Sequence, residues 1–158
     1  MTLLATFILA AAAVGGTAKI TSETTYYDRK EGFAYFNGRV FVDDNEYQLH
    51  ADRAYVFLSG TNDLKRIVAL GHVAMTNGLK RAYGVKASYY RDPGMVVLYG
   101  GDEGPAEVVE ITPKGPQSVR GRKIKFWTNT EQVEVLEAEL SAPTAGAGLG
   151  VLKEQLGK

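Results

Sequence analysis

The two histidines are the side chains in this chain best suited to hold a metal ion. His50 and His72 are the only histidines, and no cysteine is present to supply a thiolate beside them. Protein zinc sites draw three or four ligands from Cys, His and carboxylates. The two histidines fall on separate expected strands. The sequence therefore favours ordinary strand or surface positions for both over a metal site.

Other patterns with chemical potential are also incomplete. The segment Asp43-Asp44-Asn45-Glu46 resembles part of a calcium loop but lacks its central glycine and terminal glutamate, which favours a solvated turn. Ser59, Ser88 and Ser118 lack the context of a hydrolase nucleophile. The glycine-rich segment 146–150 follows no βαβ unit. We therefore predict no catalytic residue, no metal site and no cofactor.

Composition indicates one ordered globular domain without nucleic-acid binding. The 158 residues are 45% apolar and 23% charged, which suits a chain with a sizeable core. The 18 basic and 18 acidic residues cancel, whereas nucleic-acid binding generally requires a positive field. The absence of cysteine excludes disulfides, thiolate metal sites and a cysteine nucleophile.

The two ends of the chain differ from its middle. Residues 3–14 form an apolar run broken only by Thr6, too short for a bilayer that needs about 20 residues. Small residues Gly16 and Ala18 follow at the positions expected before a cleavage site, although no Lys or Arg precedes the run. We expect residues 1–18 to be a signal peptide; an uncleaved anchor and a buried helix are the alternatives. Residues 141–158 are expected to form a flexible Ala/Gly-rich tail.

Between these ends, apolar residues recur with the period of two that is typical of strands. In residues 34–42, Ala34, Phe36, Gly38, Val40 and Val42 share one face. Further strands are expected at residues 47–58 (with a bulge near Asp52-Arg53), 65–75, 82–90, 95–99, 106–112, 118–128 and 131–140. Asn77-Gly78 is the strongest hairpin signal. The spacing predicts an all-β sandwich, roll or β-solenoid.

A repeat runs through these strands. Gly71 follows Gly38 by 33 positions, Gly84 follows Ala51 by 33, and a weaker copy begins at Gly121. A period in the thirties indicates stacked supersecondary units that share one core. Because Gly38 and Gly71 occupy the apolar face, we interpret them as spacers that keep the interior open.

Several short motifs in this order resemble the OstA-like family of lipopolysaccharide-transport proteins, over about residues 20–137. They are Lys30-Glu31-Gly32, Gly38-x-Val40-x-Val42, Leu49-x-Ala51-Asp52-Arg53-Ala54, Lys65-x-Ile67-x-Ala69-x-Gly71-x-Val73, Gly84-x-x-Ala87-x-Tyr89 and Gly121-x-x-Ile124-x-Phe126. The chain is most similar to the soluble periplasmic bridge component, because it has no full transmembrane helix and no room for a large barrel.

The resemblance implies an open β-jellyroll (a β-taco) of about ten or more short antiparallel strands over residues 19–140. It implies a non-enzymatic periplasmic carrier that holds the lipid A acyl chains of lipopolysaccharide, or a similar glycolipid, between its sheets. It also implies end-to-end homo-oligomers that bridge an inner-membrane extractor to an outer-membrane translocon. Arg120, Arg122, Lys123 and Lys125, near Lys114, are either a solvated face or contacts for lipid A phosphates.

The apolar residues that would contact lipid are those on the inward strand faces. They are Phe36, Val40, Val42, Leu49, Ile67, Val73, Met75, Val96, Leu98, Ile124, Phe126, Val133 and Val135. Whether lipid or only the opposite sheet covers them stays open from sequence. Two rival functions remain: a structural β-solenoid that polymerises without lipid, and a carbohydrate-binding sandwich that would use Tyr26, Tyr27 and Trp127.

Overall fold

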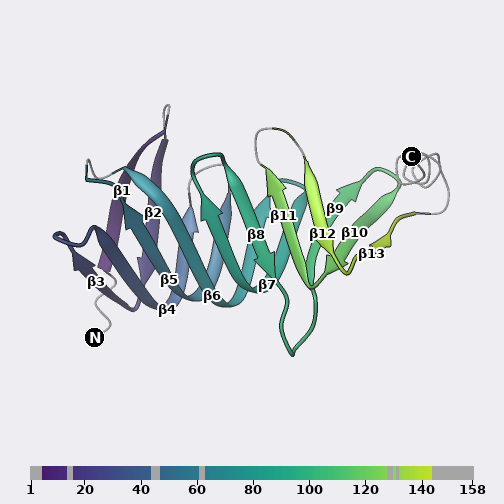
Figure 1. Ribbon diagram of the computed structural model, residues 1–158, viewed down its shortest axis with the longest axis horizontal. Coiled ribbons are helices and arrows are strands. Elements are labelled where there is room, and N and C mark those ends of the chain that lie inside the picture. Colours follow the sequence, from purple (N-terminus) through teal and green to yellow (C-terminus); the bar gives the residue numbers. More distant parts are fainter. Residues whose placement is uncertain are drawn as a thin grey trace.

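The computed structural model describes residues 5–13, 16–43, 47–60, 63–127, 130 and 132–143, with side chains from Lys19 onward. These residues form thirteen strands: β1 (Ala5–Ala13), β2 (Gly16–Ser22), β3 (Thr24–Asp28), β4 (Phe33–Asp43), β5 (Gln48–Leu58), β6 (Leu64–Asn77), β7 (Lys80–Tyr90), β8 (Met95–Tyr99), β9 (Ala106–Thr112), β10 (Gly115–Gly121), β11 (Lys123–Trp127), β12 (Val133–Leu136) and β13 (Glu139–Ser141) (Figure 1). All pairings between them are antiparallel. Within the described ranges no helix is long and apolar enough to cross a bilayer.

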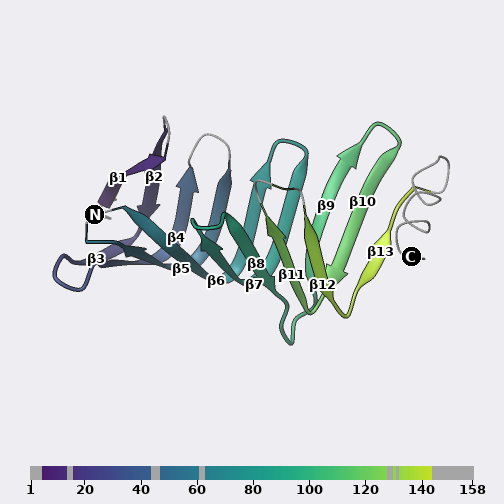
Figure 2. The same ribbon diagram turned by 45° about the horizontal axis from the view of Figure 1, so that its top comes forward.

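The long strands β4 to β7 bend near their middles, so one continuous sheet folds into two facing layers (Figure 2). The front sheet consists of β3, the first halves of β4 and β6, the second halves of β5 and β7, then β8, β11 and β12. The back sheet consists of β1, β2, the remaining halves of β4 to β7, then β9, β10 and β13. We call the line of bends the crease. This open two-layered roll confirms the predicted all-β jellyroll.

Consecutive residues with left-handed backbone produce the bends in β4 and β6. Gly38 and Arg39 have φ values of 81° and 44°, and Gly71 and His72 have 79° and 47°. The ladder register shifts at both places, between 37 and 40 and between 70 and 73. L-residues avoid this region because Cβ crowds the backbone. The 33-residue repeat is therefore the repeat of a strand corner.

The sequence suggested that these glycines are interior spacers, and this interpretation is wrong. A Cβ at Gly38 would overlap the carboxylate of Glu23, and a Cβ at Gly71 would overlap that of Asp52. Both carboxylates belong to exposed residues. Glycine is needed at each corner because the φ is positive and an acidic side chain crosses closely over the backbone.

The acidic side chain at each corner then pairs with the residue that follows the glycine. Glu23 Oε1 accepts from Arg39 Nε at 2.7 Å, and Asp52 Oδ2 lies 2.8 Å from His72 Nδ1. A related corner occurs near the C-terminus, where Glu137 has a φ of 56° and pairs with Arg122 at 3.6 Å. A pair formed by a carboxylate and a basic side chain thus lies on the solvent side of the crease at each of these corners.

Most of the expected strands and turns are confirmed, but two of the expected strands are wrong. Asn77 pairs with Lys80 across a two-residue hairpin, and β5 has its irregularity between His50 and Arg53. The single strands expected at 118–128 and 131–140 are each divided at the crease. β10 pairs with β9 while β11 pairs with β8, so the chain changes sheet at Gly121. Residues 44–46 and 144–158, which include most of the expected acidic turn and tail, lie outside the described residues.

The N-terminal apolar segment pairs with the back sheet. The backbone of β1 is antiparallel to β2, with Ala5 opposite Ser22 and Leu9 opposite Ala18. The alternative of a buried helix is therefore wrong. The expected signal peptide, residues 1–18, would include all of β1 and the first residues of β2, and its cleavage remains a prediction.

The corner geometry predicts that Gly71→Ala is destabilising. Left-handed backbone costs an L-residue about 1–2 kcal/mol, and the new Cβ must also displace Asp52. Gly60→Ala is the matched control, because Gly60 lacks the positive φ and its Cβ would meet no atom within 4 Å. Urea unfolding should show a lower midpoint for Gly71→Ala and an unchanged one for Gly60→Ala. Equal midpoints would contradict the proposed role of the corner.

The Asp52–His72 pair predicts a pH dependence of stability. The hydrogen bond and charge of Asp52 raise the pKa of His72 above its ordinary value of 6.5, and Glu103 adds to the effect. Because the folded pKa is the higher one, the added stability is fully present below pH 6.5 and is lost as pH rises through the folded pKa. Histidine NMR titration should give a midpoint above 6.5 that falls in Asp52→Asn. The same midpoint in both proteins would exclude this coupling.

Candidate functional site

The interior between the two sheets is the candidate site, and register places its residues in rows. On the front sheet the row nearest the crease contains Phe36, Ala54, Ala69, Ala87, Leu98, Ile124 and Val135. The next row, toward the open rim, contains Tyr27, Ala34, Val56, Ile67, Tyr89, Val96, Phe126 and Val133. We call these the crease row and the rim row. Every member of both rows is apolar or aromatic, and Thr25 of β3, opposite Phe36, adds one polar side chain at the N-terminal end of the crease row.

The back sheet repeats this arrangement. Its crease row contains Val40, Ala51, Val73, Gly84, Ala106 and Gly121, and its rim row contains Ile20, Val42, Leu49, Met75, Ala82, Val108, Val119 and Leu140. The two crease rows meet in two buried clusters. One includes Ala51, Ala69, Ala87 and Ala106, and the other, toward the N-terminus, includes Phe36, Val40 and Ala54. Alanines and glycines are frequent in the crease rows, although the large buried side chains of Phe36, Leu98 and Ile124 also lie there.

Large rim-row residues are only half-buried although they point inward. Leu49 and Ile67 are partly exposed near the middle of the groove, as are Tyr89, Val108 and Phe126 further along. Leu49 packs against both buried clusters and so connects the N-terminal and C-terminal halves of the interior. The inward faces therefore form a continuous apolar stripe, which we call the groove. It is accessible at these half-buried rim residues, whereas other rim-row members, including Ile20, Val56 and Val96, are buried.

The groove ends openly at the C-terminal strands. Val133 is 58% exposed and Leu140 44% exposed, although both continue the inward rim rows. Leu136, on the other face of β12, is 47% exposed. No further strand is paired beyond β12 or β13 among the described residues. This end therefore presents both unpaired backbone and uncovered apolar side chains.

The structure brings all the sequence-predicted lipid-facing residues to the inward faces. Phe36, Leu98, Ile124 and Val135 lie in the front crease row; Ile67, Val96, Phe126 and Val133 lie in the front rim row; Val40 and Val73 lie in the back crease row; and Val42, Leu49 and Met75 lie in the back rim row. Whether lipid contacts them stays a prediction. Sequence reasoning omitted Tyr89, Val108 and Val119, which strand alternation alone could have identified.

The two histidines occupy separate outer positions. His50 packs against Phe41 with the two rings tilted and their centroids 4.7 Å apart, and His72 hydrogen-bonds to Asp52 at the crease. In the part of the chain that the structure describes, no group of three or more potential metal ligands comes together.

The basic stretch near the C-terminus does not gather at the rim. Arg120 pairs with Glu107 at 3.0 Å and Lys125 with Glu134 at 3.4 Å, both on outer faces. Arg122 lies at the crease, and Lys123 lies over the ring of Tyr99. The alternative that these four cations meet phosphates at the mouth of the groove therefore receives no support from their positions.

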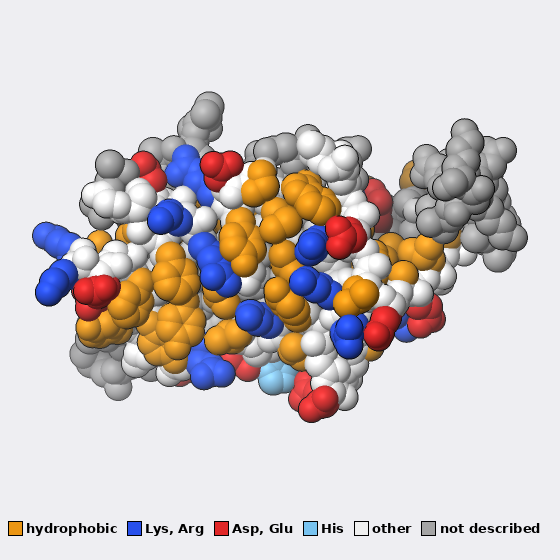
Figure 3. Space-filling view, viewed as in Figure 1, with side chains coloured by type: hydrophobic (Ala, Val, Ile, Leu, Met, Phe, Trp, Pro, Cys, Tyr) orange, Lys and Arg blue, Asp and Glu red, His pale blue; other side chains and the backbone are white. Residues whose placement is uncertain are grey.

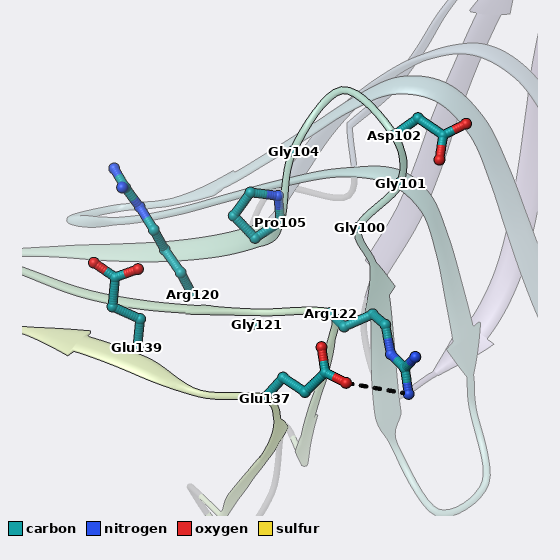
Figure 4. A pocket seen from close by; sticks show the side chains of 10 residues that line it. All are labelled: Gly100, Gly101, Asp102, Gly104, Pro105, Arg120, Gly121, Arg122, Glu137 and Glu139. Atoms are coloured by element: carbon teal, nitrogen blue, oxygen red, sulfur yellow. Dashed lines mark ion pairs between the residues drawn. The ribbon is translucent and has the colours of Figure 1, made fainter.

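A cleft of about 470 Å³ lies at the crease, outside the groove. Its walls are the loop between β8 and β9 and the chain segments that change sheet near Gly121 and Glu137 (Figure 4). Arg122 and Glu137 pair across it at 3.6 Å, and Arg120 lies beside Glu139, its cross-strand neighbour. Both arginines already have carboxylates nearby, so the cleft is a solvated corner rather than an anion site.

Comparisons with known proteins agree with this architecture. The family described as LptA/(LptD N-terminal domain) LPS transport protein matches residues 19–132. The crystal structure of LptH from Pseudomonas aeruginosa, described as the LptA-homologous periplasmic component of the lipopolysaccharide transport device, superimposes with a TM-score of 0.69 at 16% identity. The match covers 79% of this chain and 94% of LptH, and it shows a shared fold. No curated protein sequence matches the chain.

The family match covers most of the chain and spans the corners, both groove walls and most of the described strands. The order of the motifs in the sequence and the open two-layered roll agree with it. The chain therefore belongs to the LptA/LptD N-terminal domain family of lipopolysaccharide transport proteins.

Proposed function

We propose that this protein is a non-enzymatic periplasmic carrier that holds the acyl chains of lipopolysaccharide, or of a similar glycolipid, in the groove. The observation that carries the proposal is that several large rim-row residues are only half-buried. Leu49, Ile67 and Phe126 face inward between two sheets and yet keep accessible apolar surface. Acyl chains that cover such surface are stabilised by roughly 25 cal/mol per Å² removed from water.

The form of the groove favours chains over compact ligands. The rim rows continue from Ile20 and Tyr27 at one end to Val133 and Leu140 at the other. An acyl chain is long, thin and without hydrogen-bonding groups, so it requires a continuous apolar wall rather than convergent polar contacts. Similar walls along the whole length would let one molecule move through the groove without a single deep binding position.

The two rival functions have less support. A polymer-forming solenoid without cargo requires no accessible inward surface, yet the rim rows retain it. A carbohydrate-binding sandwich would require its aromatic residues to share a platform. Tyr27 points inward, and Tyr26 and Trp127, although both lie on the outer face of the front sheet, are six strands apart.

The C-terminal edge supports end-to-end assembly. Trp127 N–H donates to the carbonyl of Gln132, so these two residues form a hydrogen-bonded pair between β11 and β12. Along an antiparallel ladder, hydrogen-bonded pairs alternate with pairs whose backbone groups point away from each other. Residues 134 and 136 therefore also direct their backbone groups to β11, while Val133 and Val135 direct theirs to the free edge. An unpaired edge beside exposed apolar residues is a template for another strand. We propose that the N-terminal edge of a second copy, or of a pathway partner at either membrane, pairs there.

Photo-crosslinking tests the groove. We expect a photoreactive residue at Ile67 or Phe126 to form lipopolysaccharide adducts in cells, because both side chains face the groove and remain accessible. The same residue at Tyr83, which is 41% exposed on the outer face of the back sheet, is the control and should give none. Adducts at Tyr83 but not at Ile67 would contradict the assignment of the carrier surface.

A proline at the free edge tests assembly. Val135→Pro removes an N–H that points away from β11, so it should abolish concentration-dependent oligomers while the internal ladder is kept. Val135→Ala is the matched control, because it removes the same side chain and keeps the N–H. Light scattering over a range of concentrations would measure both. An unchanged oligomer size in Val135→Pro would show that this edge is not the joint.

A further inference from the structure

The outer face of the front sheet differs in composition from the outer face of the back sheet. Register places eight aromatic residues on the outer front face: Tyr26, Phe33, Tyr35, Tyr55, Phe57, Tyr90, Tyr99 and Trp127. The outer back face has only Phe41 and Tyr83 among its described paired residues. Figure 3 shows the outer front face as a broad apolar surface with Lys and Arg distributed across it. We call it the aromatic face.

The charges on the aromatic face are predominantly positive. Its paired rows contain the cations Arg53, Arg66, Lys86, Lys123 and Lys125, against the carboxylates Asp28 and Glu134. The whole chain has no net charge, so this face is more positive than the remainder of the molecule. On the outer back face the described paired cations and carboxylates are equal in number: Lys19, Arg81 and Arg120 against Asp43, Glu107 and Glu139.

Three of these cations make cation–π contacts with aromatic rings of the same face. The guanidinium carbon of Arg66 lies 4.9 Å from the Tyr90 centroid and 6.0 Å from that of Phe57. Lys86 and Lys123 lie 5.1 and 5.4 Å from the centroid of Tyr99. Such contacts hold a cation in place without neutralising it. Within the described residues, none of the three has a carboxylate within ion-pair distance.

Five of the rings contact one another in two groups. Tyr35 and Tyr55 lie 4.7 Å apart, Tyr55 and Phe57 6.5 Å, and Tyr26 and Phe33 5.9 Å between centroids. Tyr26 is 56% exposed and Phe57 36% exposed. Seven neighbouring strands at about 4.8 Å spacing make the aromatic face roughly 30 Å wide.

We propose that the aromatic face docks onto the surface of a membrane that contains anionic phospholipids. Tyr and Trp rings favour the interface between headgroups and acyl chains, and nearby Lys and Arg are attracted to anionic headgroups. A bilayer surface offers dispersed negative charge over an area as wide as this face. The proposal concerns the opposite side of the front sheet from the groove, so it does not depend on which cargo the groove holds.

The sole tryptophan of the chain is a built-in probe of this docking. Trp127 lies at one end of the aromatic face, opposite Met95. The full chain would be mixed with vesicles of phosphatidylcholine containing 30% phosphatidylglycerol, with pure phosphatidylcholine vesicles as reference. We expect a blue shift of the tryptophan emission, and quenching by brominated lipid, only with the anionic vesicles. High salt should reverse both, because Debye screening weakens exposed charges.

Matched charge variants test which face is responsible. The variant Arg66→Gln/Lys86→Gln/Lys123→Gln should bind anionic vesicles on the order of 100-fold more weakly, at a factor of about five for each surface cation. The control Lys19→Gln/Arg81→Gln/Lys114→Gln removes the same charge from the other side of the molecule and should bind nearly as the parent chain does. Circular dichroism and thermal unfolding would confirm that both variants are folded.

Other results would overturn the proposal. Equal weakening in the two variants would show only a general charge effect. Vesicle binding without tryptophan quenching, or binding that does not depend on salt and vesicle charge, would assign the membrane contact to the apolar N-terminal segment instead. A blue shift that depends on protein concentration without lipid would assign the aromatic face to a second copy of the chain. In the parent chain, the quenching and salt series decide the question even if a variant fails to fold.

Discussion

The left-handed corner in the middle of the long strands is the constraint on which this structure depends. Without it, β4 and β6 would continue straight and the inward residues of one flat sheet would face water. The positive φ at Gly38 and Gly71 folds the sheet onto itself, and Glu23 and Asp52 close over each corner. Each corner thus converts one amphipathic strand into a segment of both groove walls, because the inward side remains inward on either side of the bend.

Strand alternation allowed the inward faces to be predicted, because a period of two is read directly from neighbouring residues. Phe36, Val40 and Ile67 were assigned in this way and lie in the groove rows. The division of 118–128 at the crease was not predicted, because Gly121 alone does not show which strand each half pairs with. The role of Gly38 was misread for a similar reason: the Glu23 carboxylate that excludes a side chain there is fifteen residues away in sequence.

The two faces of the front sheet combine features that a simple sandwich does not require. Its inner face is apolar, buried at the crease and partly accessible at rim residues such as Ile67 and Phe126. Its outer face is a layer of rings and cation stems thick enough to bury Ser88 completely. The central strands are therefore covered on both sides within one chain.

The open C-terminal end has a thermodynamic consequence. Val133, Leu136 and Leu140 remain in contact with water in the isolated chain, so apolar surface at this end is still available for burial. A molecule that covered these residues in the folded form, and not in the unfolded one, would add to the free energy of unfolding by mass action. The measured stability would then depend on the concentration of that molecule as well as on the sequence of this chain.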